Sequence, residues 1–264
     1  MVEHVIDLLK IPKSFRNATK GSTRIPKTIL FKRADLTKTE KRILDEAVEE
    51  LTVLGIAGKG TNIPIFISEE RNYSEVLFIL CKLKGKNSPL KVAEILVSIF
   101  DKPVVLILLA TDGLYIAAGR KRINQNEKDK QITEEFRYSG PLNPDLPVHG
   151  AYIEALSIPN LKHINLFEFH DSVFTMLTPI NKDLSDKLDR YIGSKKLDNL
   201  DVFVASAIRY NALIVEEEIL KRTHKEERGS GQFGHGMQIH LEIKKKEKEK
   251  SDLLKKIKNT FTRR

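Results

Sequence analysis

The stretch that decides the fold is residues 74–119, SEVLFILCKLKGKNSPLKVAEILVSIFDKPVVLILLATDGLYIAAG. Its first ten residues, Ser74–Leu83, are largely apolar, which predicts a strand with little exposed surface. Ser88 and Pro89 then predict the start of a helix, because serine caps helix N-termini and proline fits the first turn. The apolar residues between Val92 and Phe100 recur at helical spacing. This half of the stretch therefore reads as a strand followed by a helix.

The second half of the stretch adds two strands. Pro103 ends the helix, and Val104–Leu109 is an unbroken apolar run of the kind found in buried strands. Thr111–Gly113 forms a turn that leads into another strand, Leu114–Gly119. The order β-α-β-β predicts a sheet with helices packed on it.

The segment upstream predicts a further β-α pair. Ile25–Lys32 reads as a strand and Asp35–Gly60 as a helix that packs one apolar face on the core. Thr37 and Glu40 have the spacing of a capping box, in which each satisfies an N–H group at the start of the helix. We therefore predict an α+β domain over residues 1–140, with a mixed sheet built from β-α and then β-α-β-β.

The sequence pattern changes at Pro141, and residues 141–264 are predicted to be mainly α-helical. Three prolines within seven residues mark a loop, and the apolar spacing beyond them is mostly helical. A highly charged stretch, a glycine-rich stretch (Gly229–Gly236) and a lysine-rich helix end the chain, and the two charged helices can form a hairpin. Residues 237–243 alternate apolar and polar side chains, so strand and helix both stay open there.

Composition excludes several classes of protein. A chain of 264 residues that is 41% hydrophobic and 31% charged is an ordinary globular composition, neither collagen-like nor disordered. The longest apolar run, Val104–Ala110, is far shorter than the roughly 20 residues that span a bilayer, so no membrane association is expected. A single cysteine, Cys81, rules out an intramolecular disulfide and fits the reducing cytoplasm, where we place the protein.

The net charge of +9 is concentrated at the two ends of the chain. Residues 8–33 contain eight basic residues and no acid, residues 242–264 carry a net charge of +6, and residues 34–241 carry −3. Such clustering is typical of proteins that bind polyanions, although a solvated surface has the same composition. The candidate phosphate-contacting residues of the N-terminal segment are Lys10, Lys13, Arg16, Arg24, Lys27 and Lys32.

A second basic cluster, Arg120, Lys121 and Arg122 with Asn124, follows the predicted strand Leu114–Gly119. Cations beside amides at a rigid strand end can contact phosphates, sugars or bases, and the N-terminal segment can add to the same face. The alternative is a charged strand end that discourages pairing between sheet edges.

Motifs for catalysis are weak. Gly229–Gly234 matches the spacing of a dinucleotide-binding loop, but charged residues precede it where an apolar strand is needed, so we interpret it as a turn between helices and predict no cofactor. Glu242 and Lys244 resemble half of a Mg²⁺-dependent nuclease site, yet Val202–Gln238 contains no aspartate for the other half. The histidine spacings predict no metal site.

Several short segments resemble one family. They are Ile6–Lys13, Ala34–Lys38, Asn62–Pro64, Lys121–Asn124 and Gln232–Phe233 with the charged helix after it. Together they are similar to a bacterial family catalogued as a domain of unknown function. The resemblance implies genes that lie beside helicase and DNA-methyltransferase genes in restriction-like phage-defence loci.

Three functional hypotheses follow. The first is a non-catalytic subunit that binds DNA or RNA within a bacterial DNA-processing, anti-phage complex, with a helicase or methyltransferase as its protein partner. The second is a Mg²⁺-dependent nuclease subunit that uses Glu242 and Lys244. The third is a structural adaptor that binds a partner protein through the charged C-terminal helices. The oligomeric state and the choice between DNA and RNA stay open.

Overall fold

The computed structural model of the chain describes residues 2–17, 23–33, 36–85, 88–127, 130–193, 195–230 and 233–262. These residues form two compact units. The first consists of residues 1–145 and 152–178, and the second of residues 146–151 and 179–264.

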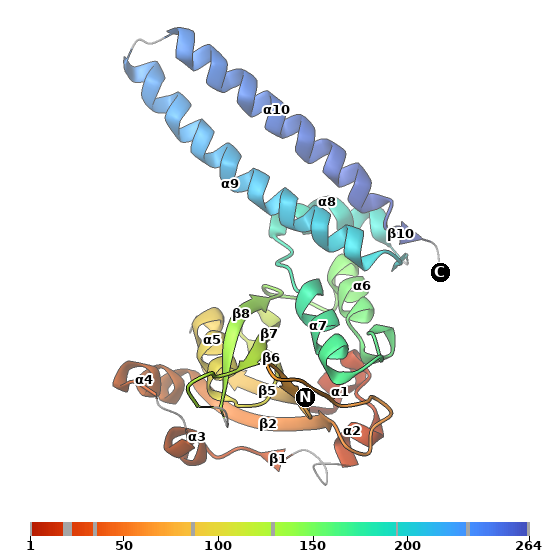
Figure 1. The fold of residues 1–264 in the computed structure, drawn as a ribbon. Coiled ribbons are helices and arrows are strands. Elements are labelled where there is room, and N and C mark those ends of the chain that lie inside the picture. The colour runs from red at the N-terminus through yellow and green to blue at the C-terminus, as the bar shows by residue number, and fades with distance from the viewer. Residues whose placement is uncertain are drawn as a thin grey trace. The chain divides into compact units, whose positions relative to one another are not determined.

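The first unit is built on one mixed sheet with the strand order β1-β2-β5-β6-β7-β8 (Figure 1). β5 and β6 are parallel, and the other neighbouring strands are antiparallel. The parallel pair needs a crossover, which helix α5 supplies. The strands are β1 (Thr23–Arg24), β2 (Val48–Ala57), β5 (Val76–Leu83), β6 (Val104–Ala110), β7 (Gly113–Ile123) and β8 (Gln131–Tyr138); β3 (Phe66–Ile67) and β4 (Asn72–Tyr73) form a separate short hairpin.

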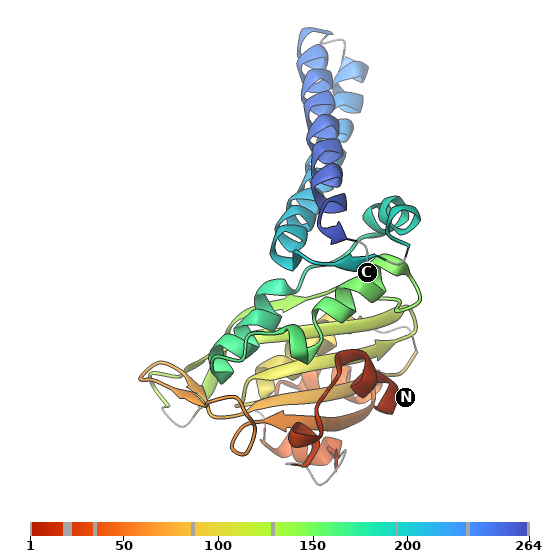
Figure 2. The same cartoon turned by 90° about the vertical axis from the view of Figure 1, so that its right-hand side faces the viewer.

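Helices cover both faces of this sheet (Figure 2). One face carries α1 (Val2–Leu9), α2 (Lys13–Asn17) and α7 (Leu166–Met176), and the other carries α3 (Lys27–Arg33), α4 (Lys38–Ala47) and α5 (Pro89–Ile99). α6 (Pro147–Ala155) begins in the second unit and ends in the first, and a 3₁₀ turn, Ile158–Asn160, follows it.

Alternating strand residues build two hydrophobic layers, one against each set of helices. On the α5 side, Ile79 and Leu106 belong to the main buried cluster together with residues of α4 and α5. On the α7 side, the rings of Phe15, Phe78 and Phe169 lie 5.8–6.1 Å apart between their centroids. Burial on both faces explains why β6 is continuously apolar and why β5 is interrupted by Lys82 alone.

The second unit is dominated by two long antiparallel helices, α9 (Leu200–Ser230) and α10 (Phe233–Lys258). α8 (Lys182–Ile192) begins at Asn181, whose side chain accepts a hydrogen bond from the Leu184 amide. β9 (Lys196–Leu197) and β10 (Phe261–Thr262) pair beside the hairpin. Met237 and the residues after it up to Ile243 are helical, so their alternating pattern does not mark a strand.

The α+β class, the β-α-β-β unit and the helical C-terminal half are confirmed. The capping box is also present, with the Glu40 amide donating to Thr37 Oγ1 (3.2 Å) and the Thr37 amide donating to Glu40 Oε2 (2.9 Å). None of the helices in the described ranges combines the length and the apolar character needed to cross a bilayer.

Two elements before Ser74 were predicted wrongly. The segment expected to be a strand contains α3, whose first turn begins at Pro26, where the carbonyl accepts from the Ile29 amide (3.0 Å). The helix expected to reach Gly60 ends at Ala47 and is followed by strand β2. β2 is irregular after Val48 and again after Val53. These irregularities shift its alternation, so buried residues fall at every third position and imitate a helix.

The structure also divides the chain differently from the predicted boundary at residue 140. Residues 152–178, including α7, belong to the unit that contains the sheet. The reason is that α7 packs its apolar residues, among them Phe169 and Phe174, on that sheet.

Candidate nucleic-acid interface

The basic cluster Arg120–Arg122 lies inside a strand and not at a strand end. β7 continues to Ile123 and pairs with β8, a strand that the sequence analysis did not predict. Successive side chains of β7 therefore point to opposite faces of a sheet that is covered by helices on both sides. This placement separates Lys121 from the arginines on either side of it.

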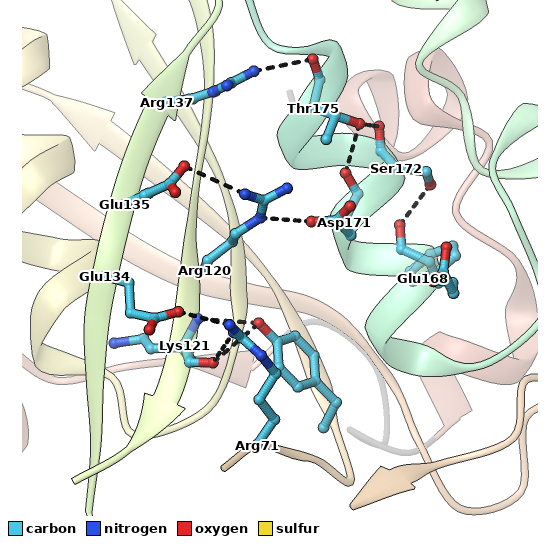
Figure 3. Close-up of polar contacts among 12 residues, drawn as sticks. Arg71, Arg120, Lys121, Glu134, Glu135, Arg137, Glu168, Asp171, Ser172 and Thr175 are labelled. Carbon is cyan, nitrogen blue, oxygen red and sulfur yellow. Dashed lines mark hydrogen bonds and ion pairs between the residues drawn. The ribbon is translucent and has the colours of Figure 1, made fainter. Parts of the chain in front are cut away.

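Arg120 points toward α7 and is held by two carboxylates (Figure 3). Its Nε donates to Asp171 Oδ1 (2.7 Å), and its Nη1 lies 3.4 Å from Glu135 Oε2. The guanidinium also lies 4.5 Å from the ring centroid of Phe174, and that of Arg137 lies 4.9 Å from the same ring. The hydrogen bond to Asp171 raises the pKa of Arg120. Its positive charge is thus compensated within the protein.

Lys121 points to the other face and is completely buried. Its Nζ donates to the carbonyl oxygen of Ser98 (3.3 Å), near the C-terminal end of α5, where backbone carbonyls favour a cation. Burial lowers the pKa of the Lys121 ammonium to about 8. The prediction that Lys121 contacts phosphate is therefore wrong for this fold, because its ammonium does not reach the surface.

The backbone of Lys121 sits at a bulge, where the pairing of β7 with β8 shifts by one residue. Tyr73, which is fully buried, accepts the Lys121 amide proton at its hydroxyl oxygen (3.0 Å). Arg71 donates from Nη1 to the Lys121 carbonyl oxygen (2.9 Å). Side chains from the β4 hairpin region thus replace the missing ladder partners, as buried backbone groups require.

The remaining members of the cluster also have partners. Arg122 Nε lies 3.3 Å from Glu134 Oε1, and Arg71 Nη2 donates to the other oxygen of the same carboxylate (2.9 Å). Asn124 Oδ1 accepts from the Asn126 amide (3.1 Å), which stabilises the turn after β7. Arg122 keeps about a third of its side chain exposed (37%) and is the member of this cluster best placed to meet a phosphate.

The predicted N-terminal cations divide into paired and free residues. Lys10 Nζ lies 2.5 Å from Glu154 Oε1, Arg16 Nη1 3.6 Å from Glu3 Oε2 and Lys27 Nζ 3.4 Å from Asp45 Oδ1. Lys13, Arg24 and Lys32 are exposed, and no carboxylate of the described ranges pairs with them.

These free cations do not converge on one surface. Lys13 belongs to α2 on one face of the sheet, Arg24 to edge strand β1, and Lys32 to α3 on the opposite face. The N-terminal segment therefore wraps around the sheet edge, and its positive charge is spread over several sides of the unit.

The lysines of α10 are arranged differently. The lysines that face α9 form ion pairs with its carboxylates: Lys246 pairs with Glu216 and Lys250 with Glu217. The bonds from Lys246 and Arg209 lower the pKa of Glu216. On the inner surface of the hairpin, the charges of these lysines are therefore neutralised by carboxylates of α9.

The outer face of α10 keeps its charge. Lys245, Lys248 and Lys256 are exposed, and within the part of the chain that is described no carboxylate pairs with them. At 3.6 residues per turn they fall within about 80° of one another, on the side opposite the buried Ile243. Counting charge along the sequence found the lysine-rich segment but not this division into inner and outer lysines.

The two residues of the nuclease hypothesis do not form the expected arrangement. Glu242 and Lys244 lie in α10, where a spacing of two residues places side chains about 200° apart around the helix. A carboxylate and a lysine two positions apart share one face only in a strand. Among the described residues, no group of three or more histidine, cysteine, aspartate or glutamate side chains is placed to hold a metal ion.

The glycine-rich stretch lies where α9 ends and α10 begins. Residues 231 and 232, inside the match to a dinucleotide-binding loop, fall outside the described residues. The element before this stretch is the charged helix α9, whereas a dinucleotide site requires a strand there.

Comparison with known proteins gives one finding. No curated protein matches the chain, and no solved structure matches it either. A family model, described as a domain of unknown function (DUF4391), matches residues 9–249. The match covers most of the chain, so this protein belongs to the DUF4391 family.

Proposed function

We propose that this protein is a non-catalytic subunit that binds nucleic acid, and that the outer lysines of α10 form its main contact with the phosphate backbone. We further propose that it serves a bacterial DNA-processing complex of the restriction-like, anti-phage type, beside a helicase or methyltransferase. The binding proposal rests on the charge distribution, and the complex is the context that the family resemblance implies.

The observation that carries the proposal is the contrast between the two basic regions of the fold. The arginines at residues 120 and 122 are paired with carboxylates, whereas Lys245, Lys248 and Lys256 are not. A lysine without a carboxylate partner in the protein contributes its whole electrostatic free energy to phosphate binding, because no existing ion pair has to break first.

The geometry of α10 also suits a linear polyanion. A rise of 1.5 Å per residue places Lys245 and Lys256 about 16 Å apart along one face. Lys244 and Lys255 flank this face, although each also contacts an acid of its own helix, Glu247 and Asp252 respectively. A row of this length can contact several successive phosphates.

The test is the salt dependence of binding. Fluorescence anisotropy of the full chain with labelled duplex and single-stranded oligonucleotides is measured over a range of salt concentrations. Log affinity falls linearly with the logarithm of the salt concentration. Each neutralised phosphate contributes about −0.9 to this slope for duplex DNA and about −0.7 for single strands. The variant K245Q/K248Q/K256Q should therefore flatten the slope by up to about 2.7 for duplex and about 2 for single strands.

The matched control removes the same charge elsewhere. Lys38, Lys41 and Lys59 are exposed residues of the first unit without ion-pair partners among the described residues, so K38Q/K41Q/K59Q changes net charge equally. The proposal predicts a smaller loss of slope for this control. Equal losses would mean that binding follows net charge alone, and absence of salt-dependent binding by the full chain would refute the proposal.

A structural adaptor is the second candidate, and one observation favours it. Ile208, Val215 and Ile219 are 46%, 57% and 58% exposed on α9, at spacings that place them on one side of the helix. Exposed apolar side chains in a row are typical of surfaces that bind another protein. Replacing Val215 and Ile219 by aspartate should abolish assembly with the proposed helicase or methyltransferase partner, and leave binding of nucleic acid unchanged.

A further inference from the structure

Tyr191, near the end of α8, is an exposed aromatic side chain surrounded by cations. It is 39% exposed. Lys195 Nζ lies 3.4 Å from the centroid of its ring, and Lys258 Nζ lies 5.2 Å from it. Lys195 follows α8 and Lys258 ends α10, so two separate segments of the second unit bring ammonium groups to one ring.

These two lysines have no other strong partner. In the described part of the chain, no carboxylate forms an ion pair with Lys195 or Lys258. A lysine over an exposed aromatic ring gains only about 0.5–1 kcal/mol. Either ammonium can therefore leave the ring for a phosphate at little cost.

Tyr191 also lies near the end of α10, beside the outer lysines. Lys258, which contacts the ring, is thirteen residues beyond Lys245 on the same helix, about 20 Å along its axis. At 100° per residue, Lys258 lies about 80° around the helix from Lys248, and Lys255 lies between them. A strand that follows the outer lysines therefore reaches the ring by winding past Lys255. At about 3.4 Å per nucleotide of a stacked strand, the axial length alone corresponds to about six nucleotides.

We propose that Tyr191 is a stacking platform for an unpaired base, and that the ligand of this surface is single-stranded nucleic acid. The phosphates of the strand follow the outer lysines of α10. One base displaces the Lys195 ammonium from the face of the Tyr191 ring, and this ammonium then contacts a phosphate. A base inside a duplex already stacks on its neighbours and does not reach the ring. This inference rests on the proposed function and adds the preferred strand state to it.

Aromatic residues between cations are the usual means of holding single strands, because every base has a flat face and the lysines hold the backbone. If the ring served only to cover lysine stems, an apolar side chain of similar size would replace it without consequence. The distinction between these roles is measurable.

The first test uses fluorescence. The chain contains no tryptophan, so Y191W places a single tryptophan at the platform. Stacking of a base should quench its emission when a single-stranded oligothymidine or oligouridine is added, and duplex DNA should quench it far less. The control reporter is I219W on α9, an exposed position away from the platform, where no quenching is expected.

The second test compares affinities of the full-length variants. Base stacking on an aromatic side chain corresponds to about a five- to 150-fold change in affinity on removal of the ring. We expect Y191A and Y191L to lose this factor for single strands and less than twofold for duplex, and Y191F to retain wild-type affinity. Circular dichroism and melting temperature confirm that each variant is folded. The thymidine and uridine arms show whether DNA or RNA is bound more tightly.

The outcomes separate the two proposals. If single strands bind with the expected salt slope, but Y191L binds as wild type and Y191W is not quenched, the platform is refuted while the lysine face stands. Preference of the wild type for duplex refutes the platform in the same way. If neither strand state shows salt-dependent binding, both proposals fall together.

Discussion

Replacing Lys121 by methionine should stabilise the first unit at neutral pH. The side chain is completely buried between the sheet and α5, and its ammonium has one hydrogen-bond acceptor, the Ser98 carbonyl, at 3.3 Å. Methionine has a similar length and no charge, so it fills the same volume without the desolvation cost. Replacing a buried charge by an apolar side chain of similar shape is often stabilising.

The magnitude follows from the pKa of Lys121, which burial lowers from 10.5 to about 8. At pH 7 this difference corresponds to about 3 kcal/mol that the folded state loses by holding the charge. As pH rises through 8, the folded protein releases the proton while the unfolded chain keeps it, so the wild type gains stability. Between pH 7 and pH 9 the gain amounts to about 1 kcal/mol. The advantage of the methionine variant should shrink by that amount.

Cys81 provides the assay. It is the single cysteine of the chain and is fully buried in β5, so a thiol reagent labels it when the sheet opens. Burial also raises the pKa of its thiol to about 12, which keeps it unreactive in the folded protein. Urea titrations with a short labelling pulse, normalised to fully unfolded protein at each pH, give the free energy of unfolding of the sheet.

The comparison needs a lysine that is not buried. Lys41 is exposed on α4, and K41M should differ from the wild type by the same small amount at every pH. Groups such as the Cys81 thiol affect all three proteins equally and cancel in the differences. If K121M is less stable than the wild type at pH 7, or if its difference does not change with pH, then the ammonium of Lys121 is not buried as described.

Three further predictions concern the same sheet. Gly119→Ala should lower the free energy of unfolding by about 1–3 kcal/mol, because the added Cβ would lie 2.6 Å from Val97 Cγ1; an unchanged urea midpoint would contradict this packing. Tyr73→Phe removes the acceptor of the Lys121 amide and should cost about 1–3 kcal/mol, with faster hydrogen exchange at that amide. Burial lowers the pKa of His170 to about 4, so the unfolded chain takes up a proton at a higher pH than the folded protein does. The free energy of unfolding should therefore decrease as pH falls from about 6.5 to 4. His170→Gln should reduce this decrease, which urea titrations at each pH measure.

The centre of the fold was predictable because several local signals agree there. The apolar strands on either side of α5, the proline at the start of that helix and the turn before Leu114 all indicate one arrangement, and the structure has it. β8 was not predictable in the same way. Its sequence, QITEEFRY, carries three charges because it is an edge strand. Its two acids form ion pairs with Arg71 and with arginines of β7.

The candidate site was predictable only as a composition. Sequence shows that residues 120–122 and the end of the chain are basic, but pairing depends on residues that are far away in sequence. Asp171 neutralises Arg120 across 51 positions, and Glu216 neutralises Lys246 across 30. Neither pairing leaves a local signal, so the choice between an internal network and a free surface required the fold.

The two basic regions show why the same composition has different consequences in a sheet and in a helical hairpin. In a sheet covered on both faces, successive side chains enter two closed layers, so Arg120 meets α7 and Lys121 meets α5. Each cation then needs a partner inside the protein. In a hairpin of two helices, only the side of α10 that faces α9 is closed, and the lysines on the other side stay in contact with solvent. A lysine-rich helix that is covered on one side by a single helix therefore keeps a cationic face by geometry alone. This face is where a polyanion competes least with carboxylates of the protein.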